Sequence, residues 1–183
     1  GGNISNDGST PAINIRNGNT TIEGGEITSN NNVGIKTASN GTMDILGRTI
    51  KGKTYGVHVN YSSTKVNIGS NDDNVDPDLP ERKPVIIGET YGLYKSSGTV
   101  SFYDGIIEGK NNAVYYGEIN EVADGTEIVK GTDTIDNEQY YTVYLYVQDD
   151  FLQVYGGGTY NSLKKAIGAI TGTGQIIVYR DGK

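Results

Sequence analysis

The densest group of possible ligand atoms in the sequence is a set of aspartates within one short segment. Its members are Asp72, Asp73, Asp76 and Asp78. Carboxylate oxygens at such close spacing are the hard donors that Ca²⁺ requires. The spacing is not that of an EF-hand, because the glycine and the distal glutamate of that loop do not follow in place. A calcium site is therefore one hypothesis for this segment, and a solvated acidic loop is the interpretation that we favour.

Tyrosine is the second residue type that could bind a ligand, and the chain has 14 tyrosines. A flat ring can stack on the apolar face of a sugar while its hydroxyl reaches a polar partner. The candidates for such a platform are Tyr61, Tyr94, Tyr103, Tyr115 and Tyr116. The alternative is that tyrosines at equivalent positions of a repeat stack on one another as structure, as we expect for Tyr55 and Tyr91.

The composition argues against several other kinds of chemistry. The chain has no cysteine and a single histidine, His58, so a thiolate metal site, a histidine zinc site or a histidine-containing triad is hard to build within it. His58 lies between Val57 and Val59, so an alternating strand would turn it towards solvent. The formal net charge is −7 with no basic block, which makes nucleic acid an unlikely partner. No apolar run is long enough to insert in a membrane.

An internal repeat shows which elements must position these residues. A glycine or alanine between bulky apolar residues recurs at Gly34, Gly56, Gly92 and, in a degenerate copy, Ala113. The intervals are 22, 36 and 21 residues, and removing a 14-residue insertion at 70–83 returns the long interval to 22. A second set of markers appears to agree, because Thr20, Thr42 and Thr64 are each 22 residues apart and Thr99 follows after 35.

Each repeat unit contains short runs in which apolar and polar residues alternate, such as those at 43–45 and 66–68, with glycine or asparagine at the breaks. Alternation with a period of two is typical of half-buried strands. Three short strands and three turns fit in about 22 residues, which is one turn of a solenoid. The sequence therefore predicts an all-β, right-handed parallel β-helix of about four turns over residues 1–117. A leucine-rich repeat lacks its signature here, and a β-sandwich does not require a fixed period.

The repeat fades after residue 117, and residues 118–183 are predicted to form a small α/β appendage. We expect strands at 140–147 and 151–155, joined as a hairpin by a turn at 148–150. A helix is expected within 159–170, because Leu163, Ala166, Ile167 and Ile170 have helical spacing behind Asn161 or Ser162 as N-cap. A last strand is expected at 175–179. The appendage would cap the solenoid or begin another module.

The segments TIEGGEITSNNNVGI, SFYDGIIEGKNNAVYYG and YGGGTYNSLKKAIGAITGTGQIIVYRD resemble adhesin-like surface proteins of Gram-positive bacteria that contain pectate-lyase-like β-helices. The match of the last segment lies at Tyr160, Ser162, Leu163, Ala166 and Ile167. The resemblance covers nearly the whole chain and implies an extracellular, cell-surface location. Because the chain starts with glycine instead of methionine, we interpret it as part of a longer protein, with any signal or anchor outside it.

The resemblance also raises an enzymatic alternative, a polysaccharide lyase or glycoside hydrolase. Polysaccharide lyases of this fold hold Ca²⁺ with clustered carboxylates and use an arginine or lysine as base. The residues that could serve here are Asp44, Asp104 and Glu108 with Arg48, Lys51 or Lys110. Such enzymes have more turns and longer loops around a cleft, so we predict no catalytic residues. We predict a non-catalytic structural or adhesive module without a cofactor, whose partners are surface glycans or host proteins; the sequence leaves its oligomeric state open.

Overall fold

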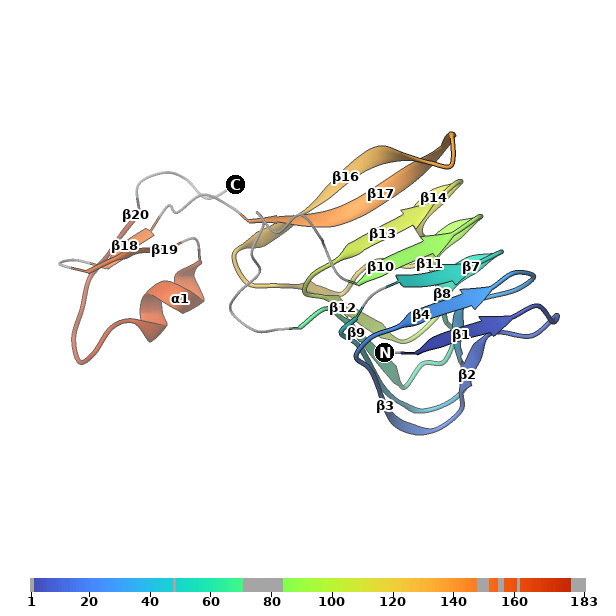
Figure 1. Ribbon diagram of the computed structural model, residues 1–183. Helices are drawn as coiled ribbons and strands as arrows, with labels where there is room; N and C mark the ends of the chain where they lie inside the picture. The colour runs from blue at the N-terminus through green and yellow to red at the C-terminus, as the bar shows by residue number, and fades with distance from the viewer. Residues whose placement is uncertain are drawn as a thin grey trace.

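The computed structural model describes residues 2–47, 49–70, 84–147, 152–154, 157–160 and 162–178. In these residues the chain forms short strands and one short helix, and most of the strands stack into a solenoid of about five turns (Figure 1). The parallel β-helix predicted from the repeat is therefore confirmed.

Three parallel sheets form the walls of the solenoid, and every turn contributes one strand to each. Wall A contains β1 (Asn3–Asn6), β4 (Glu26–Ser29), β7 (Thr49–Gly52), β10 (Val85–Gly88) and β13 (Ile106–Gly109). Wall B contains β2 (Ile13–Ile15), β5 (Ile35–Thr37), β8 (Tyr55–Val59), β11 (Tyr91–Lys95) and β14 (Asn112–Tyr115). Wall C contains β3 (Gly18–Ile22), β6 (Gly41–Ile45), β9 (Thr64–Ile68), β12 (Thr99–Phe102) and β15 (Glu121–Val122).

The structure has about five turns where the sequence predicted four. The difference is the first turn, formed by β1, β2 and β3, in which Ala12 stands where the next three turns have glycine. Because the count followed the glycine marker, this turn was left out of it. The predicted insertion lies between β9 and β10, and β10 resumes the register of β7 with Val85 beside Thr49. Residues 71–83 of the insertion lie outside the described residues.

The core is a narrow column in which like side chains lie over one another. In wall A the buried file is Ile27, Ile50, Ile86 and Ile107, which are register partners in successive turns. Walls B and C add parallel files, such as Ile35, Val57 and Leu93. Each wall supplies a single layer of apolar side chains, so a solenoid needs fewer apolar residues than a globule does. This explains how a chain with 34% hydrophobic residues can fold.

The glycines of the repeat are required by close packing at the corner between walls A and B. A Cβ atom on Gly56 would lie 2.6 Å from Ile86 Cγ2 and 2.8 Å from the carbonyl oxygen of Gly92 in the next turn. The same holds for Gly34, whose Cβ would lie 2.6 Å from the carbonyl oxygen of Gly56. Ala113 takes this position in the last turn, where wall B has no further strand. The degenerate copy in the sequence therefore marks the end of the stack.

The threonine markers, by contrast, do not form a file, so that part of the sequence interpretation was wrong. Thr20 is the register partner of Met43, and Thr42 is the partner of Lys65. Thr64 lies beside Gly41, and Thr99 beside Lys65. The reason is that successive positions in the first part of wall C are 23 residues apart, as Gly18, Gly41 and Thr64 show. Turns of slightly different length keep wall B in register at 22 residues but shift wall C by one.

A long antiparallel hairpin follows the fifth turn. It consists of β16 (Thr126–Ile135) and β17 (Glu138–Val147), and Asp136 and Asn137 form its turn with φ of 51° and 63°. β17 pairs with β13, so the hairpin extends wall A beyond the last turn (Figure 1). The strand predicted at 140–147 is therefore present, but the pairing predicted for it was wrong: its partners are β13 and β16.

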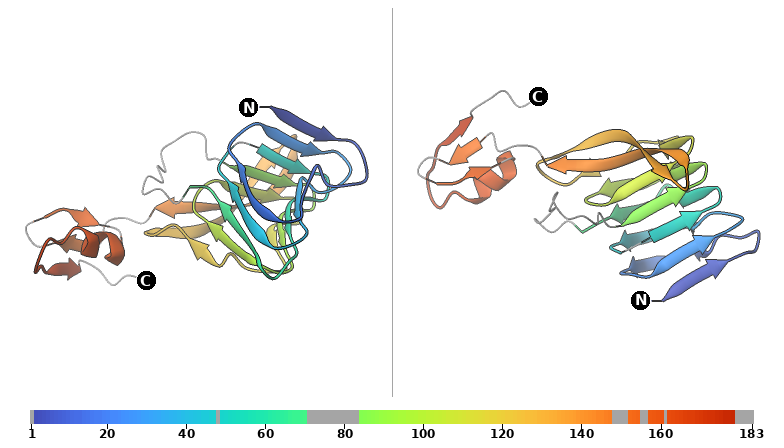
Figure 2. Two further views of the ribbon diagram at one scale, coloured as in Figure 1. Left: turned by 90° about the horizontal axis from the view of Figure 1, so that it is seen from below. Right: turned by 45° about the horizontal axis from the view of Figure 1, so that its top comes forward.

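The remaining described residues form a small unit beside the solenoid (Figure 2). It contains β18 (Leu152–Val154), β19 (Thr159–Tyr160), β20 (Ile176–Val178) and the helix α1 (Leu163–Gly168). Ser162 is the N-cap, and its hydroxyl accepts a hydrogen bond of 3.1 Å from the backbone N–H of Lys165. The same hydroxyl donates to Asp124, which follows β15. The helix and the last strand were predicted, and Ser162 is the N-cap of the two candidates.

Candidate functional site

Five tyrosines gather on the outer face of wall B. We call them the tyrosine patch: Tyr55, Tyr91, Tyr94, Tyr115 and Tyr116. They come from β8, β11 and β14 and from the residue after β14. Side chains alternate between the two faces of a strand, and parallel register places equivalent positions over one another. Tyr91 accordingly lies beside Tyr55, and Tyr115 beside Tyr94.

The rings of the patch stack closely. Tyr55 is parallel to Tyr94 with ring centroids 4.6 Å apart, and Tyr91 is parallel to Tyr115 at 4.1 Å. Tyr55 and Tyr91 also stack, at 5.8 Å, as their equivalent positions in the repeat predicted. Each stacked pair contributes roughly 0.5–1.5 kcal/mol beyond the area that it buries. The ring faces inside the stack are therefore used for structure.

The exposure of the rings rises towards the last turn. Tyr55, Tyr91 and Tyr94 are partly buried, whereas Tyr115 is 41% exposed and Tyr116 is 72% exposed. Tyr116 stacks on Tyr94 at 5.9 Å and is tilted against Tyr115 at 6.4 Å. The stack thus ends in a ring that is mostly open to solvent, and this is the ring that can accept a ligand.

Tyr116 also has an unusual backbone conformation, with φ of +76°. A bulky residue other than glycine rarely adopts this left-handed region, because its Cβ crowds the backbone there. Strain of this kind clusters at functional sites. The chain keeps a large aromatic ring at a position where glycine would be less strained.

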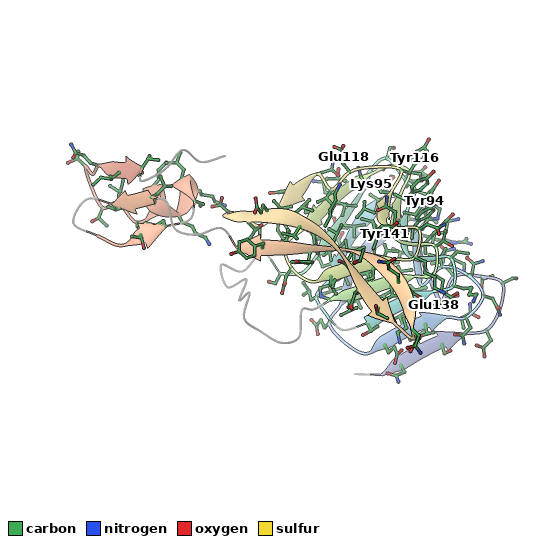
Figure 3. The ribbon with its side chains drawn as sticks, turned by 90° about the horizontal axis from the view of Figure 1, so that it is seen from above. Tyr94, Lys95, Tyr116, Glu118, Glu138 and Tyr141 are labelled. Atoms are coloured by element: carbon green, nitrogen blue, oxygen red, sulfur yellow. The ribbon has the colours of Figure 1, made fainter. Side chains whose placement is uncertain are left out.

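Charged side chains border the exposed end of the patch. Lys95 and Glu118 lie on the same side of the molecule as Tyr94 and Tyr116 (Figure 3). Lys95 is partly buried at the end of β11, and Glu118 is exposed two residues after Tyr116. The aromatic surface is therefore flanked by a hydrogen-bond donor and an acceptor.

His58 lies on the outer face of wall B, as predicted, with Val57 and Val59 buried on either side of it. Its ring packs edge-on against Tyr55 at 5.5 Å and against Tyr94 at 4.8 Å. Burial, and secondarily the charge of Lys36, lowers the pKa of His58 to about 4. The imidazole is neutral at pH 7 and supports the rings.

Two of the five predicted tyrosines lie elsewhere. Tyr61 is exposed at the corner between β8 and β9, and Tyr103 follows β12 on wall C, where its hydroxyl is 3.2 Å from Oε2 of Glu121. The structure therefore brings together Tyr94, Tyr115 and Tyr116 and adds Tyr55 and Tyr91. The added pair shares the outer face of the same strands, and the repeat marked both residues.

The predicted metal ligands Asp72, Asp73, Asp76 and Asp78, and the candidate base Arg48, lie outside the described residues. Among the residues that are described, no group of three or more histidine, aspartate or glutamate side chains could hold a metal ion.

The described candidates for polysaccharide cleavage do not converge. Asp44 faces outwards on wall C and accepts a 2.7 Å hydrogen bond from Asn67 Nδ2. Asp104 is at the corner after β12, where it accepts from the backbone N–H of Gly105. Lys51 is on wall A, 3.7 Å from Glu26, and Lys110 forms ion pairs with Glu89 and Glu138. No two of these carboxylates share a wall with a free base beside them.

Glu108 is the candidate whose environment is most unusual. It lies on β13 beside Thr142 of β17 and is 4% exposed. Burial, and secondarily the carboxylate of Asp133, raises the pKa of Glu108 to about 7. Such a shift is found both at functional sites and in buried structural pairs. Here the carboxyl group lies in the junction between the last turn and the hairpin, away from the tyrosine patch.

A cavity of about 260 Å³ opens at the end of the solenoid, between the last turn and the hairpin. Val114, Ile119, Ile128 and Val143 form its apolar lining. Its polar lining consists of Asn112, Glu118 and Lys130, and Gly117 completes it. Sequence reasoning missed this cavity, because the hairpin that forms one side of it does not follow the repeat.

No helix among the described residues is long and apolar enough to cross a membrane. Comparison of the chain with protein-family models, with curated proteins and with solved structures finds no match.

Proposed function

We propose that this chain is a non-catalytic module of a bacterial cell-surface protein and that it binds carbohydrate at the exposed end of the tyrosine patch. The observation that carries the proposal is Tyr116, a ring that is 72% exposed in a strained backbone conformation at the end of a stack of aromatic rings. The cell-surface location rests on the resemblance of the sequence to adhesin-like proteins.

The stack supports a binding role because it holds the terminal rings in place before a ligand arrives. Tyr116 rests on Tyr94, which in turn rests on Tyr55, so little side-chain freedom is left to lose on binding. The apolar face of a pyranose can cover the open ring, while Lys95 and Glu118 are near enough to the patch to hydrogen-bond sugar hydroxyls. A binding surface of this kind needs no catalytic group.

The proposal is tested by screening the purified chain on a glycan array and measuring the affinity for the best glycan. Tyr116→Gly removes the ring and relieves the positive φ, so we expect at least tenfold weaker binding with unchanged or slightly raised thermal stability. Tyr116→Phe keeps the ring and should retain most of the affinity.

Tyr61→Gly is the matched control, because Tyr61 is also exposed but lies away from the patch. It should bind like the wild type. If no glycan binds, or if Tyr61→Gly and Tyr116→Gly weaken binding equally, the proposal fails.

A further inference from the structure

The end of the solenoid offers a second binding surface, separate from the open ring of Tyr116. β14 is the outermost strand of wall B, so one edge of its backbone has no strand partner among the described residues. Backbone N–H and C=O groups on such an edge can pair with another extended chain. The adjacent strand β13 already does this, because β17 adds to its edge in antiparallel register.

β14 lacks the features that normally protect an edge strand. Charged residues or proline on an edge discourage pairing with other chains. The outermost strand of wall A, β16, carries Glu127, Lys130 and Asp133, and β15 of wall C is only two residues long. The sequence of β14, by contrast, is Asn-Ala-Val-Tyr, without charge or proline. At this end of the solenoid it is therefore the strand best suited to accept a partner.

The cavity of about 260 Å³ lies against this strand. Asn112 and Val114 of β14 line one side, and Ile128, Lys130 and Val143 of the hairpin line the opposite side. The left-handed turn at Tyr116 leads into Gly117 and Glu118, which also line the cavity. The result is a short groove with a strand edge along one side and an apolar pocket beside it.

Two opposite charges border the groove without a partner. Glu118 and Lys130 form no ion pair with any described residue. An extended peptide matches all of these features, because its main chain supplies donors and acceptors in the spacing of a strand and its side chains alternate towards and away from the pocket.

A second copy of the chain fits less well. End-to-end stacking of solenoids would have to pair walls A, B and C of one copy with those of the next at the same level. Wall A is prolonged by β17 and β16, whereas walls B and C end at β14 and β15. The end of the solenoid is therefore stepped, and it accommodates one strand at wall B more readily than a whole turn.

We infer that β14 is a docking strand for an extended peptide segment of a partner protein, which pairs with its free edge and places an aliphatic side chain in the adjacent cavity. This is independent of carbohydrate binding, so a glycan array and a peptide titration give separable answers.

The test uses an acetylated and amidated pentapeptide of alternating threonine and valine, titrated into the ¹⁵N-labelled chain. We expect the largest amide shifts at 112–115, with slower hydrogen exchange there. Alternate N–H groups of a strand point to opposite edges. Of two peptides that are N-methylated on the two alternate sets, one should therefore bind at least tenfold more weakly and the other should bind like the parent.

Ile128→Lys places a charge at the cavity and should weaken the parent peptide at least tenfold. Ile4→Lys is the matched control, because Ile4 is a similarly exposed isoleucine on β1 at the other end of the solenoid. It should leave the affinity unchanged.

The inference is overturned if the pentapeptide causes no shifts at 112–115, if both N-methylated peptides bind alike, or if Ile128→Lys has no effect. It is also overturned if sedimentation equilibrium shows self-association that Ile4→Lys abolishes, since the occupant would then be a second copy.

Discussion

At the scale of single residues, the fold depends most directly on the glycines at the corner between walls A and B. Gly56→Ala would force a methyl group against Ile86 and against the carbonyl oxygen of Gly92. Overpacking of this kind costs about 1–3 kcal/mol. We therefore expect a lower free energy of unfolding by that amount in urea denaturation.

Gly24→Ala provides the control for this substitution, because a Cβ on Gly24 has no heavy atom within 4 Å. Its unfolding free energy should stay within about 0.5 kcal/mol of the wild type. Equal effects of the two substitutions would show that the corner is not closely packed.

His58 and Glu108 predict a pH dependence in which two effects oppose each other. The pKa of Glu108 is raised to about 7, so its contribution to stability is fully present below the unfolded pKa and is lost as the pH rises through about 7. The pKa of His58 is lowered to about 4, so its contribution is present above the unfolded pKa and is lost as the pH falls through about 4. Each effect amounts to at most about 3 kcal/mol.

Because the two windows overlap, the wild type should show a nearly flat stability between pH 4 and pH 7. Glu108→Gln should leave stability that rises with pH, and His58→Asn should leave stability that falls with pH. Urea denaturation at several pH values measures both slopes. Parallel profiles for the three proteins would contradict the burial of these two groups.

The tyrosine patch illustrates what residue spacing can and cannot predict. The stacking of Tyr55 on Tyr91 follows from their equivalent places in the repeat. The closer contacts of Tyr55 with Tyr94, and of Tyr91 with Tyr115, join positions that are not equivalent. They arise because these side chains share the outer face of wall B and lean towards one another between turns. Tyr61 and Tyr103 were misplaced as candidates because exposure alone does not bring residues together.

At the scale of elements, the hairpin β16–β17 is the part that the sequence analysis did not recognise as a hairpin. β16 reads TEIVKGTDTI, with charged residues and a glycine inside the strand, and it pairs antiparallel outside the repeat. A method that looks for a fixed period finds no signal there. The turn at Asp136 and Asn137 was the available sequence signal, since both residue types tolerate a left-handed backbone.

The hairpin turn gives a test of this element. Asn137 has φ of +63°, so Asn137→Val should destabilise the protein by roughly 1–2 kcal/mol, while Asn137→Gly should be neutral or stabilising. Thermal denaturation compares the two variants. If valine and glycine were tolerated equally, the turn would not have the left-handed conformation that closes the hairpin.

The helix α1 shows the opposite case, in which the element was predicted but its packing was not. Leu163 and Ile167 have the spacing of a buried face, yet they are 56% and 55% exposed. Only Ala166 of the expected apolar face is fully buried. Periodicity identifies an amphipathic helix, but whether its apolar face is covered depends on the surrounding elements.

At the scale of the whole molecule, the period and the short alternating strands were sufficient to predict the fold class. They did not predict the number of turns, because the first turn lacks the glycine, nor the cavity, which depends on the hairpin. The ligand surfaces proposed here both lie where the repeat ends: the last ring of the stack is uncovered there, and so is the last strand edge of wall B. Sequence periodicity describes the inner turns and carries little information about their boundary.

The most direct test of the account is whether residues one turn apart are neighbours. The chain has no cysteine, so engineered pairs report without background. Lys36 and His58 are register partners on wall B, where strands lie about 4.8 Å apart, within the range that a disulfide can bridge. Lys36→Cys with His58→Cys should form an intramolecular disulfide under mild oxidation. Lys36→Cys with Lys51→Cys, which lie on different walls, should not. Failure of the first pair, or equal cross-linking of both pairs, would contradict the stacked turns on which both binding surfaces depend.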